Sequence, residues 1–89
     1  MATVDFTPNL QRHLTLDPCK VSGTSLSEIL RNLFARHEKL EGYLLDDQGE
    51  LRKHMTIFID GAAIQDRRTQ SDSVSPDSEV YIAQALSGG

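Results

Sequence analysis

The sequence of 89 residues has little of three things on which many protein functions depend: cysteine, positive charge and long hydrophobic runs. Its single cysteine, Cys19, cannot form an internal disulfide, and cannot by itself hold an iron–sulfur cluster or a structural zinc ion. The three histidines, His13, His37 and His54, lack the spacing of metal ligands, and nothing in the sequence places one beside Cys19 as an activating base. We therefore expect a structural Cys19, no metal site and a fold stabilised by packing alone.

Positive charge is the second scarcity, and it is uneven along the chain. The sequence holds 9 lysines and arginines against 13 aspartates and glutamates, a net charge of −4, and the whole deficit lies in residues 46–89. The pair Arg67-Arg68 is too small for a nucleic-acid surface, because binding to a phosphate backbone needs a basic stripe, and we interpret it as a surface feature. Nucleic acids and anionic membranes are therefore not expected partners.

Hydrophobic runs are short throughout. None approaches the roughly 20 residues that a membrane-spanning helix needs. The start of the chain, Met1–Phe6, lacks the basic region and the apolar core of a signal peptide, so a cytoplasmic protein is expected. A chain of this length buries only about 60–65% of its unfolded surface. Its modest core excludes a large enclosed active site.

One helix pattern stands out among what the sequence does contain. Apolar residues recur at the spacing of a single helix face: Leu26, Ile29, Leu30, Leu33 and Phe34. Ser25 stands three residues before Glu28, as in a capping box. Together these signals predict a helix over about 25–38.

The remaining segments are predicted to be strands, turns and one surface loop. Alternating patterns or short apolar runs predict extended segments at 3–6, 13–16, 19–21, 55–60, 62–65 and 79–85. The pair Asp60-Gly61 is a hairpin signal. Residues 40–45 are expected to pack beneath the sheet as an irregular segment, 46–49 to form a tight turn, and 66–78 to form a loop with at most one helical turn.

This order of elements predicts an α+β domain in which one main helix crosses one face of a sheet. The helix lies in the connection between the two halves of the sheet, and such a crossover allows parallel strands. We therefore expect the first and last strands to be parallel neighbours at the centre. Val80 and Ile82 are expected to point inward.

The end of the sequence, Leu86-Ser87-Gly88-Gly89, follows directly after the last predicted strand. Glycine has no Cβ and tolerates positive φ, so such a segment can approach another protein's active site closely. Four extended residues reach at most about 14 Å, which suits a narrow tunnel. The reactive group at the tip would be the α-carboxylate of Gly89, which is inert until another enzyme activates it. A flexible end without function is the alternative interpretation.

These features together resemble the ubiquitin-like sulfur carriers of the MoaD/ThiS family. The resemblance rests on the order of strands and helix, on residues 44–51 (LLDDQGEL) and 57–61 (IFIDG), and on Ser87-Gly88-Gly89, and it covers essentially the whole chain. It implies a β-grasp fold with a mixed sheet of four to five strands. The domain would span residues 1–85, and residues 86–89 would form a flexible tail.

The resemblance also implies a function without a catalytic site or bound cofactor in this chain. A partner adenylyltransferase similar to ubiquitin-activating enzymes would use ATP to adenylate Gly89, and sulfur would convert it to a thiocarboxylate. Gly88, Ser87 and Leu86 would thread into the partner. A biosynthetic enzyme would then accept the sulfur. In some relatives a metalloprotease first removes residues that follow the glycine pair.

The segment between the predicted helix and the 55–60 strand is longer than in compact thiamine carriers. This length favours carriers that serve cysteine or thiolated secondary metabolites, with molybdopterin and thiamine as the other branches. Two further functions stay open. One is a protein modifier joined to amines through Gly89, and the other is a ubiquitin-like interaction domain whose glycines have no role.

A docking surface is predicted on the sheet face away from the helix. Phe58, Tyr81 and Ala83 would lie there if their neighbours in sequence point into the core. Aromatic side chains are favoured at the centre of interfaces, although scattered surface hydrophobics are also common. The acidic surplus around residues 60–79 either guides a basic partner or serves as a solvating surface.

Overall fold

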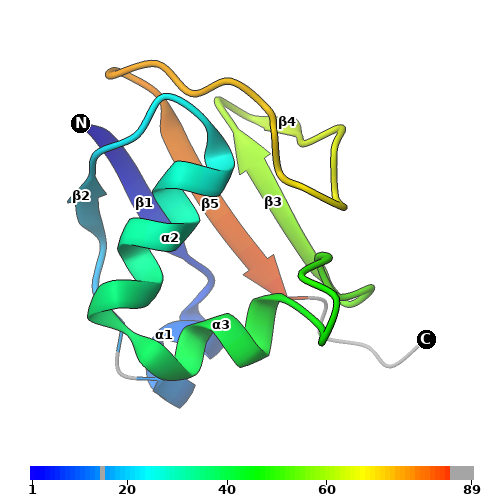
Figure 1. Cartoon of the computed structure of the whole chain (residues 1–89). Coiled ribbons are helices and arrows are strands. Elements are labelled where there is room, and N and C mark those ends of the chain that lie inside the picture. Colours follow the sequence, from blue (N-terminus) through cyan, green and yellow to red (C-terminus); the bar gives the residue numbers. More distant parts are fainter. Residues whose placement is uncertain (15, 85–89) are drawn as a thin grey trace.

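A mixed sheet forms one layer of the molecule, and helices pack across one of its faces (Figure 1). The computed structural model describes residues 1–14 and 16–84. Within them the elements are β1 (Ala2–Phe6), α1 (Pro8–Leu14), β2 (Cys19–Val21), α2 (Leu26–Arg36), α3 (Glu38–Leu44), β3 (Met55–Ile59), β4 (Ala62–Ala63) and β5 (Glu79–Gln84).

The five strands are arranged in the order β2-β1-β5-β3-β4. β1 and β5 are parallel neighbours, and the other neighbouring pairs are antiparallel. The predicted parallel pairing of the first and last strands at the centre of the sheet is confirmed. β5, the last described strand, is thus held on both sides.

The core lies between the sheet and the helices. Every second residue of β1 is buried, and in β5 the inward residues Val80 and Ile82 are buried as predicted. Met55 and Ile57 of β3 are buried as well, whereas Ile59 is only half-buried at the end of the strand. This period-two alternation is the reason that these short runs form half-buried strands.

α2 begins at the predicted capping signal. The Ser25 hydroxyl accepts a hydrogen bond from the Glu28 N–H, and the Glu28 carboxylate accepts from the Thr24 N–H at 2.8 Å and from the Thr24 hydroxyl. These bonds from Thr24 lower the pKa of Glu28. The capping box therefore reaches one residue further back than usual. The helix ends at Arg36, two residues before the predicted end at 38.

The extended segment predicted at 13–16 is wrong, because residues Pro8–Leu14 form α1. Proline ends a strand, but its fixed φ and missing N–H also suit the first position of a helix. Leu10 and Leu14 lie four residues apart on one helix face, and Leu10 is fully buried. Pro8 therefore starts a helix two residues after the end of β1.

The irregular segment predicted at 40–45 is also wrong in its conformation, because Glu38–Leu44 forms α3. Its packing is as predicted: Leu40 and Leu44 are fully buried, and Tyr43 and Leu45 pack against the core. The domain therefore has three helices in its described part, of which α2 is the longest.

The predicted turns are present and explain how the strands connect. Asp60 and Gly61 both have positive φ, 53° and 86°, the requirement of a type I′ hairpin turn. β4 is shorter than the predicted 62–65, because Ile64 leaves the strand and is buried. In the 46–49 turn the Asp46 carboxylate accepts from the backbone N–H groups of residues 48 and 50.

Candidate functional site

β5 carries the chain toward its predicted reactive end. Five register pairs join it to β3 and four join it to β1, so the strand is fixed up to Gln84, which lies opposite Met55. The residues predicted to react or to thread, Leu86, Ser87, Gly88 and Gly89, lie outside the described residues. Their roles stay predictions, and so does the boundary at residue 85. The structure places the last anchored residue before them in the middle of the sheet.

The end of β5 opens into a hollow between two helices. Asn9 and Arg12 of α1, Tyr43 of α3 and Gln84 line it. The Arg12 guanidinium donates a hydrogen bond of 2.9 Å to the Asn9 side-chain oxygen. This part of the site was not predicted, because the sequence patterns of both segments were interpreted as non-helical. The Pro8 start and the spacing of Leu10 and Leu14 are the signals that could have found α1.

Basic groups gather where β5 ends. Lys53 and His54 are exposed in the turn directly before Met55, the residue that pairs with Gln84. Arg12 is also exposed. We call Gln84 together with Arg12, Lys53 and His54 the exit of β5.

The predicted docking residues do share one surface, on the face away from α2 and α3 (Figure 1). Phe58 and Tyr81 are direct partners in the register of β3 and β5, and Ala83 is the next outward residue of β5. Tyr81 is 38% exposed, and the other two are half-buried. A hollow beside Phe58 and Tyr81 continues onto β1, where Thr3 and Asp5 line it. The apolar side chains Phe58 and Tyr81 are thus bordered by the polar residues Thr3, Asp5 and Glu79.

Three of the five acidic residues in the segment 60–79 accept hydrogen bonds from hydroxyl and backbone N–H groups of nearby residues. We call residues 66–78 the approach loop because it leads into β5. The Asp66 carboxylate accepts from the hydroxyl groups of Thr69 and Ser71 and from the Arg68 N–H. The hydroxyl bonds from Ser71 and Thr69 hold the pKa of Asp66 well below its usual range.

The approach loop is tied down at two further carboxylates. Asp72 accepts from the backbone N–H groups of Gln65 and Asp66, both at 2.9 Å. Asp60 accepts from the Ser78 hydroxyl and from the Glu79 N–H. These acids hold the loop in shape, a role that the sequence analysis did not assign to them.

Arg67 has an internal role, which corrects its interpretation as a surface residue. Its guanidinium donates to the carbonyl oxygens of Arg52 and Met55, both at 2.7 Å, and so ties the approach loop to the start of β3. Arg68 is exposed and lies 3.9 Å from the Glu50 carboxylate, a contact of little energetic weight.

Cys19 is partly buried and packs against the core from the edge strand β2. Among the residues that the structure describes, no three histidine, cysteine or acidic side chains come together as a metal site. In the same residues no helix is long and apolar enough to cross a membrane.

The sheet order, the central parallel pair and the helix across one face define the chain as a β-grasp domain of the ubiquitin-like kind. Solved structures share this fold over nearly the whole chain. A chain of the BexX/CysO complex from Amycolatopsis orientalis superposes with a TM-score of 0.83 at 19% identity, covering 100% of both chains. CysO from Mycobacterium tuberculosis, described as an antigen, gives 0.82 at 19% identity, covering 97% of this chain and 100% of that one.

The small archaeal modifier protein SAMP1 from Methanosarcina acetivorans is a third neighbour. It gives a TM-score of 0.82 at 20% identity, covering 99% of this chain and 95% of that one. No protein-family model and no curated protein matches the sequence. At these identities the likeness establishes the fold, and it agrees with the ubiquitin-like fold that the sequence resemblance implied.

Proposed function

We propose that this chain is a ubiquitin-like sulfur carrier whose cargo is bound at Gly89. The observation that carries the proposal is the glycine pair Gly88-Gly89, four and five residues beyond an anchored central strand of a β-grasp domain. The CysO and SAMP1 structures among its neighbours support it. The chain acts as a protein co-substrate, and partner enzymes in the cytoplasm supply the catalysis.

The chemistry requires Gly89 to be the C-terminal residue that the partner receives. The Gly89 carboxylate attacks the α-phosphorus of ATP and releases pyrophosphate, which gives an acyl-adenylate. Hydrosulfide then attacks the carbonyl carbon, AMP leaves and a proton is lost, which gives the thiocarboxylate. ATP is consumed by the partner, and a relative with residues after the glycine pair would need a metalloprotease first.

The exit of β5 and the sheet face supply the geometry for this chemistry. The partner docks on Phe58, Tyr81 and Ala83, and Leu86 and Ser87 lead the glycines into its active site. The length of the segment that contains α3 favours an acceptor enzyme that makes cysteine or a thiolated metabolite over one that makes molybdopterin or thiamine. A CysO has been crystallised with the protein BexX, which supports complex formation with a receiving partner.

Intact-mass spectrometry tests the proposal. The chain ending at Gly89 is incubated with its cognate activating enzyme, ATP and sulfide. We expect the mass to rise by the difference between sulfur and oxygen, and the change to vanish when Gly89 is deleted. A chain that keeps its mass under these conditions contradicts the proposal.

Cys19→Ser is the matched control because Cys19 is the chain's other site for sulfur. A persulfide on that thiol would add a whole sulfur atom, whereas the thiocarboxylate exchanges sulfur for oxygen. The Cys19→Ser variant should therefore show the same exchange as the parent chain. A gain of a whole sulfur atom by the parent chain that is absent from Cys19→Ser would place the sulfur on the cysteine instead.

A protein modifier is the second candidate, and the SAMP1 neighbours favour it because that protein is described as a modifier. The activation step would be the same, but a lysine amine would attack the acyl-adenylate or a thioester derived from it. Covalent adducts between Gly89 and lysines of other proteins would identify this function. A chain that undergoes no chemistry at Gly89 with either kind of partner would be an interaction domain.

A further inference from the structure

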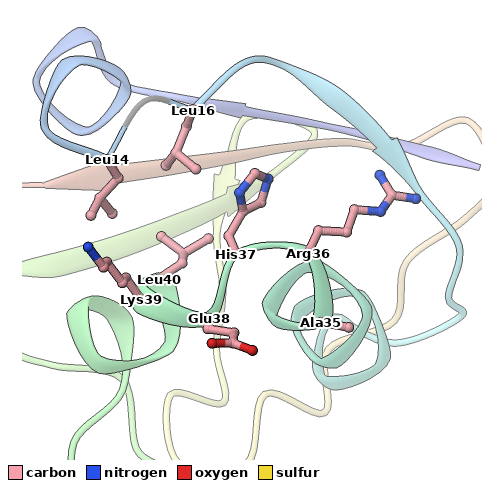
Figure 2. A pocket seen from close by; sticks show the side chains of 8 residues that line it. All are labelled: Leu14, Leu16, Ala35, Arg36, His37, Glu38, Lys39 and Leu40. Atoms are coloured by element: carbon pink, nitrogen blue, oxygen red, sulfur yellow. The ribbon is translucent and has the colours of Figure 1, made fainter.

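A groove lies on the helical side of the domain, away from the sheet face and separate from the exit of β5. It runs between the α1–β2 connection and the corner where α2 passes into α3, with a volume of about 380 Å³ (Figure 2). Neither the carrier function nor the docking face uses it. We call it the corner groove.

Leucine side chains form the apolar part of the corner groove. Leu16 and Leu40 are buried at its base, and Leu14 is half-buried at its side. In Figure 2 Leu14 and Leu16 approach Leu40 from the opposite wall. Leu14 is therefore the part of this leucine base that one apolar side chain of a partner can contact.

Basic side chains form the rim of the corner groove. Of its eight lining residues Arg36, His37 and Lys39 are basic and Glu38 is acidic. Figure 2 shows the Glu38 carboxylate pointing away from Leu14 and Leu16, whereas Lys39 reaches toward Leu14. The Arg36 guanidinium is fixed by a hydrogen bond of 3.2 Å to the Lys20 carbonyl. This rim is positive in a chain whose net charge is −4.

We infer that the corner groove binds an acidic segment of a partner protein, in which carboxylates flank one apolar side chain. The apolar side chain would contact the leucine base, and the carboxylates would pair with Lys39 and Arg36. The groove lies on the helical side and Tyr81 on the opposite face of the sheet. A protein bound in the groove would therefore leave the docking face accessible. This inference does not depend on the chemistry of Gly89.

An NMR titration of the isotopically labelled full chain tests the inference with three short synthetic peptides. The first peptide has one leucine between pairs of glutamates. The second replaces the leucine by serine, and the third replaces the glutamates by lysines. We expect the first peptide to bind most tightly, and its amide shifts to cluster at Leu16, Ala35 and residues 37–40. The loss of affinity of the serine peptide would give the contribution of the leucine base to binding. The loss of affinity of the lysine peptide would give the contribution of the basic rim.

Charge reversal at the rim gives a matched pair of variants. Lys39→Glu should weaken binding of the first peptide about fivefold, the effect of losing one rim pair and gaining a repulsion. The variant should fold, because Lys39 lies in the first turn of α3, where acidic residues are favoured. Arg31→Glu makes a charge reversal at an exposed residue of α2 outside the groove and should alter binding less than about twofold.

Four results would overturn the inference. The first is the absence of groove shifts at millimolar peptide. The second is equal binding of the lysine peptide. The third is a cluster of shifts around Phe58 and Tyr81 instead of the groove. The fourth is an equal loss of affinity in Lys39→Glu and Arg31→Glu.

Discussion

The approach loop and the exit of β5 lie at the two ends of one strand and use their charges differently. In the approach loop, Asp66 and Asp72 accept several hydrogen bonds each from nearby backbone and hydroxyl groups. At the exit, Arg12, Lys53 and His54 are exposed. The acids shape the path into the strand, and the basic residues remain accessible where the strand ends.

The fold separates acidic and basic residues that are close together in the sequence. The acidic surplus of the sequence lies in residues 46–89. In the fold, Asp60 and Glu79 lie at the start of β5, and the strand carries the chain away from them to Gln84. The exposed side chains of Arg12, Lys53 and His54 lie at this end of the strand. A partner that receives the tail would meet Arg12 and Lys53 before it met the acidic loop.

β5 connects the two regions. Truncating a buried side chain of this strand is therefore expected to lower the free energy of unfolding most. Ile82 is fully buried and pairs in register with Phe6 and Ile57. Ile82→Ala should lower the free energy of unfolding by about 2–5 kcal/mol, the loss of buried surface plus a cavity. Urea unfolding measures it. Tyr81→Ala, on the exposed side of the same strand, should cost less than about 1 kcal/mol, and equal losses would contradict the assignment of faces.

The second prediction compares the loss of stability from one glutamine in the approach loop with that from one glutamine at the exit of β5. Gln70 is 5% exposed, and its side-chain amide donates to the carbonyls of Gly49 and Arg67. Gln70→Leu keeps the volume but removes both hydrogen bonds. The Arg67 carbonyl keeps the Leu51 N–H as a donor, whereas the Gly49 carbonyl loses the amide, so the change should cost about 1–3 kcal/mol in urea unfolding. Gln84→Leu makes the same change at the half-buried exit and should cost less than about 0.5 kcal/mol. A larger loss at Gln84 would reverse the comparison.

The sheet and α2 could be predicted from the sequence because each carries a strong local pattern. β1 alternates apolar and polar residues, and β3 and β5 contain the short apolar runs Ile57–Ile59 and Val80–Ala83. α2 has five apolar residues on one face together with a capping signal. The two short helices could not be recognised in this way. α1 presents only Leu10 and Leu14 to the core, and α3 contains Gly42, which disfavours a helix interior by about 1 kcal/mol. Packing against the sheet decides their conformation.

The candidate site was predictable to the same extent as its elements. The shared face of Phe58, Tyr81 and Ala83 follows from strand alternation, which needs no long-range information. The hollow at Gln84 depends on α1 and α3, so errors in those helices concealed it. The structural role of Arg67 was also out of reach, because its acceptors at Arg52 and Met55 come from another part of the chain.

A third prediction tests whether the docking face acts separately from the stability of the strand. Tyr81→Ala should lower kcat/KM for adenylation by the cognate activating enzyme about tenfold, the effect of removing one aromatic contact from an interface. Pyrophosphate release measures the rate. Lys20→Ala, at an exposed residue of the edge strand β2, is the control and should leave it unchanged. Similar kcat/KM values for Tyr81→Ala and the parent chain would mean that the activating enzyme does not dock on Tyr81.

The smallest expected effect concerns the pH response of the approach loop. Its hydrogen bonds hold the pKa of Asp66 below the ordinary value of about 3.9 that the unfolded chain has. The carboxylate therefore stabilises the fold above about pH 4, and this contribution is lost as the pH falls through the lowered pKa of the folded state. Asp66→Asn should be less stable than the parent chain at pH 7, and the difference should shrink below about pH 4. Urea midpoints measured between pH 7 and pH 2 would follow it.

Asp47→Asn provides the matched control, because it removes the same charge from an exposed residue of the 46–49 turn. Its midpoints should run parallel to those of the parent chain through the acid range. Faster amide hydrogen exchange at Thr69 and Ser71 in Asp66→Asn would locate the loss in the approach loop, since both residues donate to this carboxylate. A difference for Asp66→Asn that stays constant from pH 7 to pH 2 would mean that substitution, rather than the charge, disturbs the loop. In that case the negative charge of Asp66 would contribute no more to the stability of the fold than the exposed basic residues at the exit of β5.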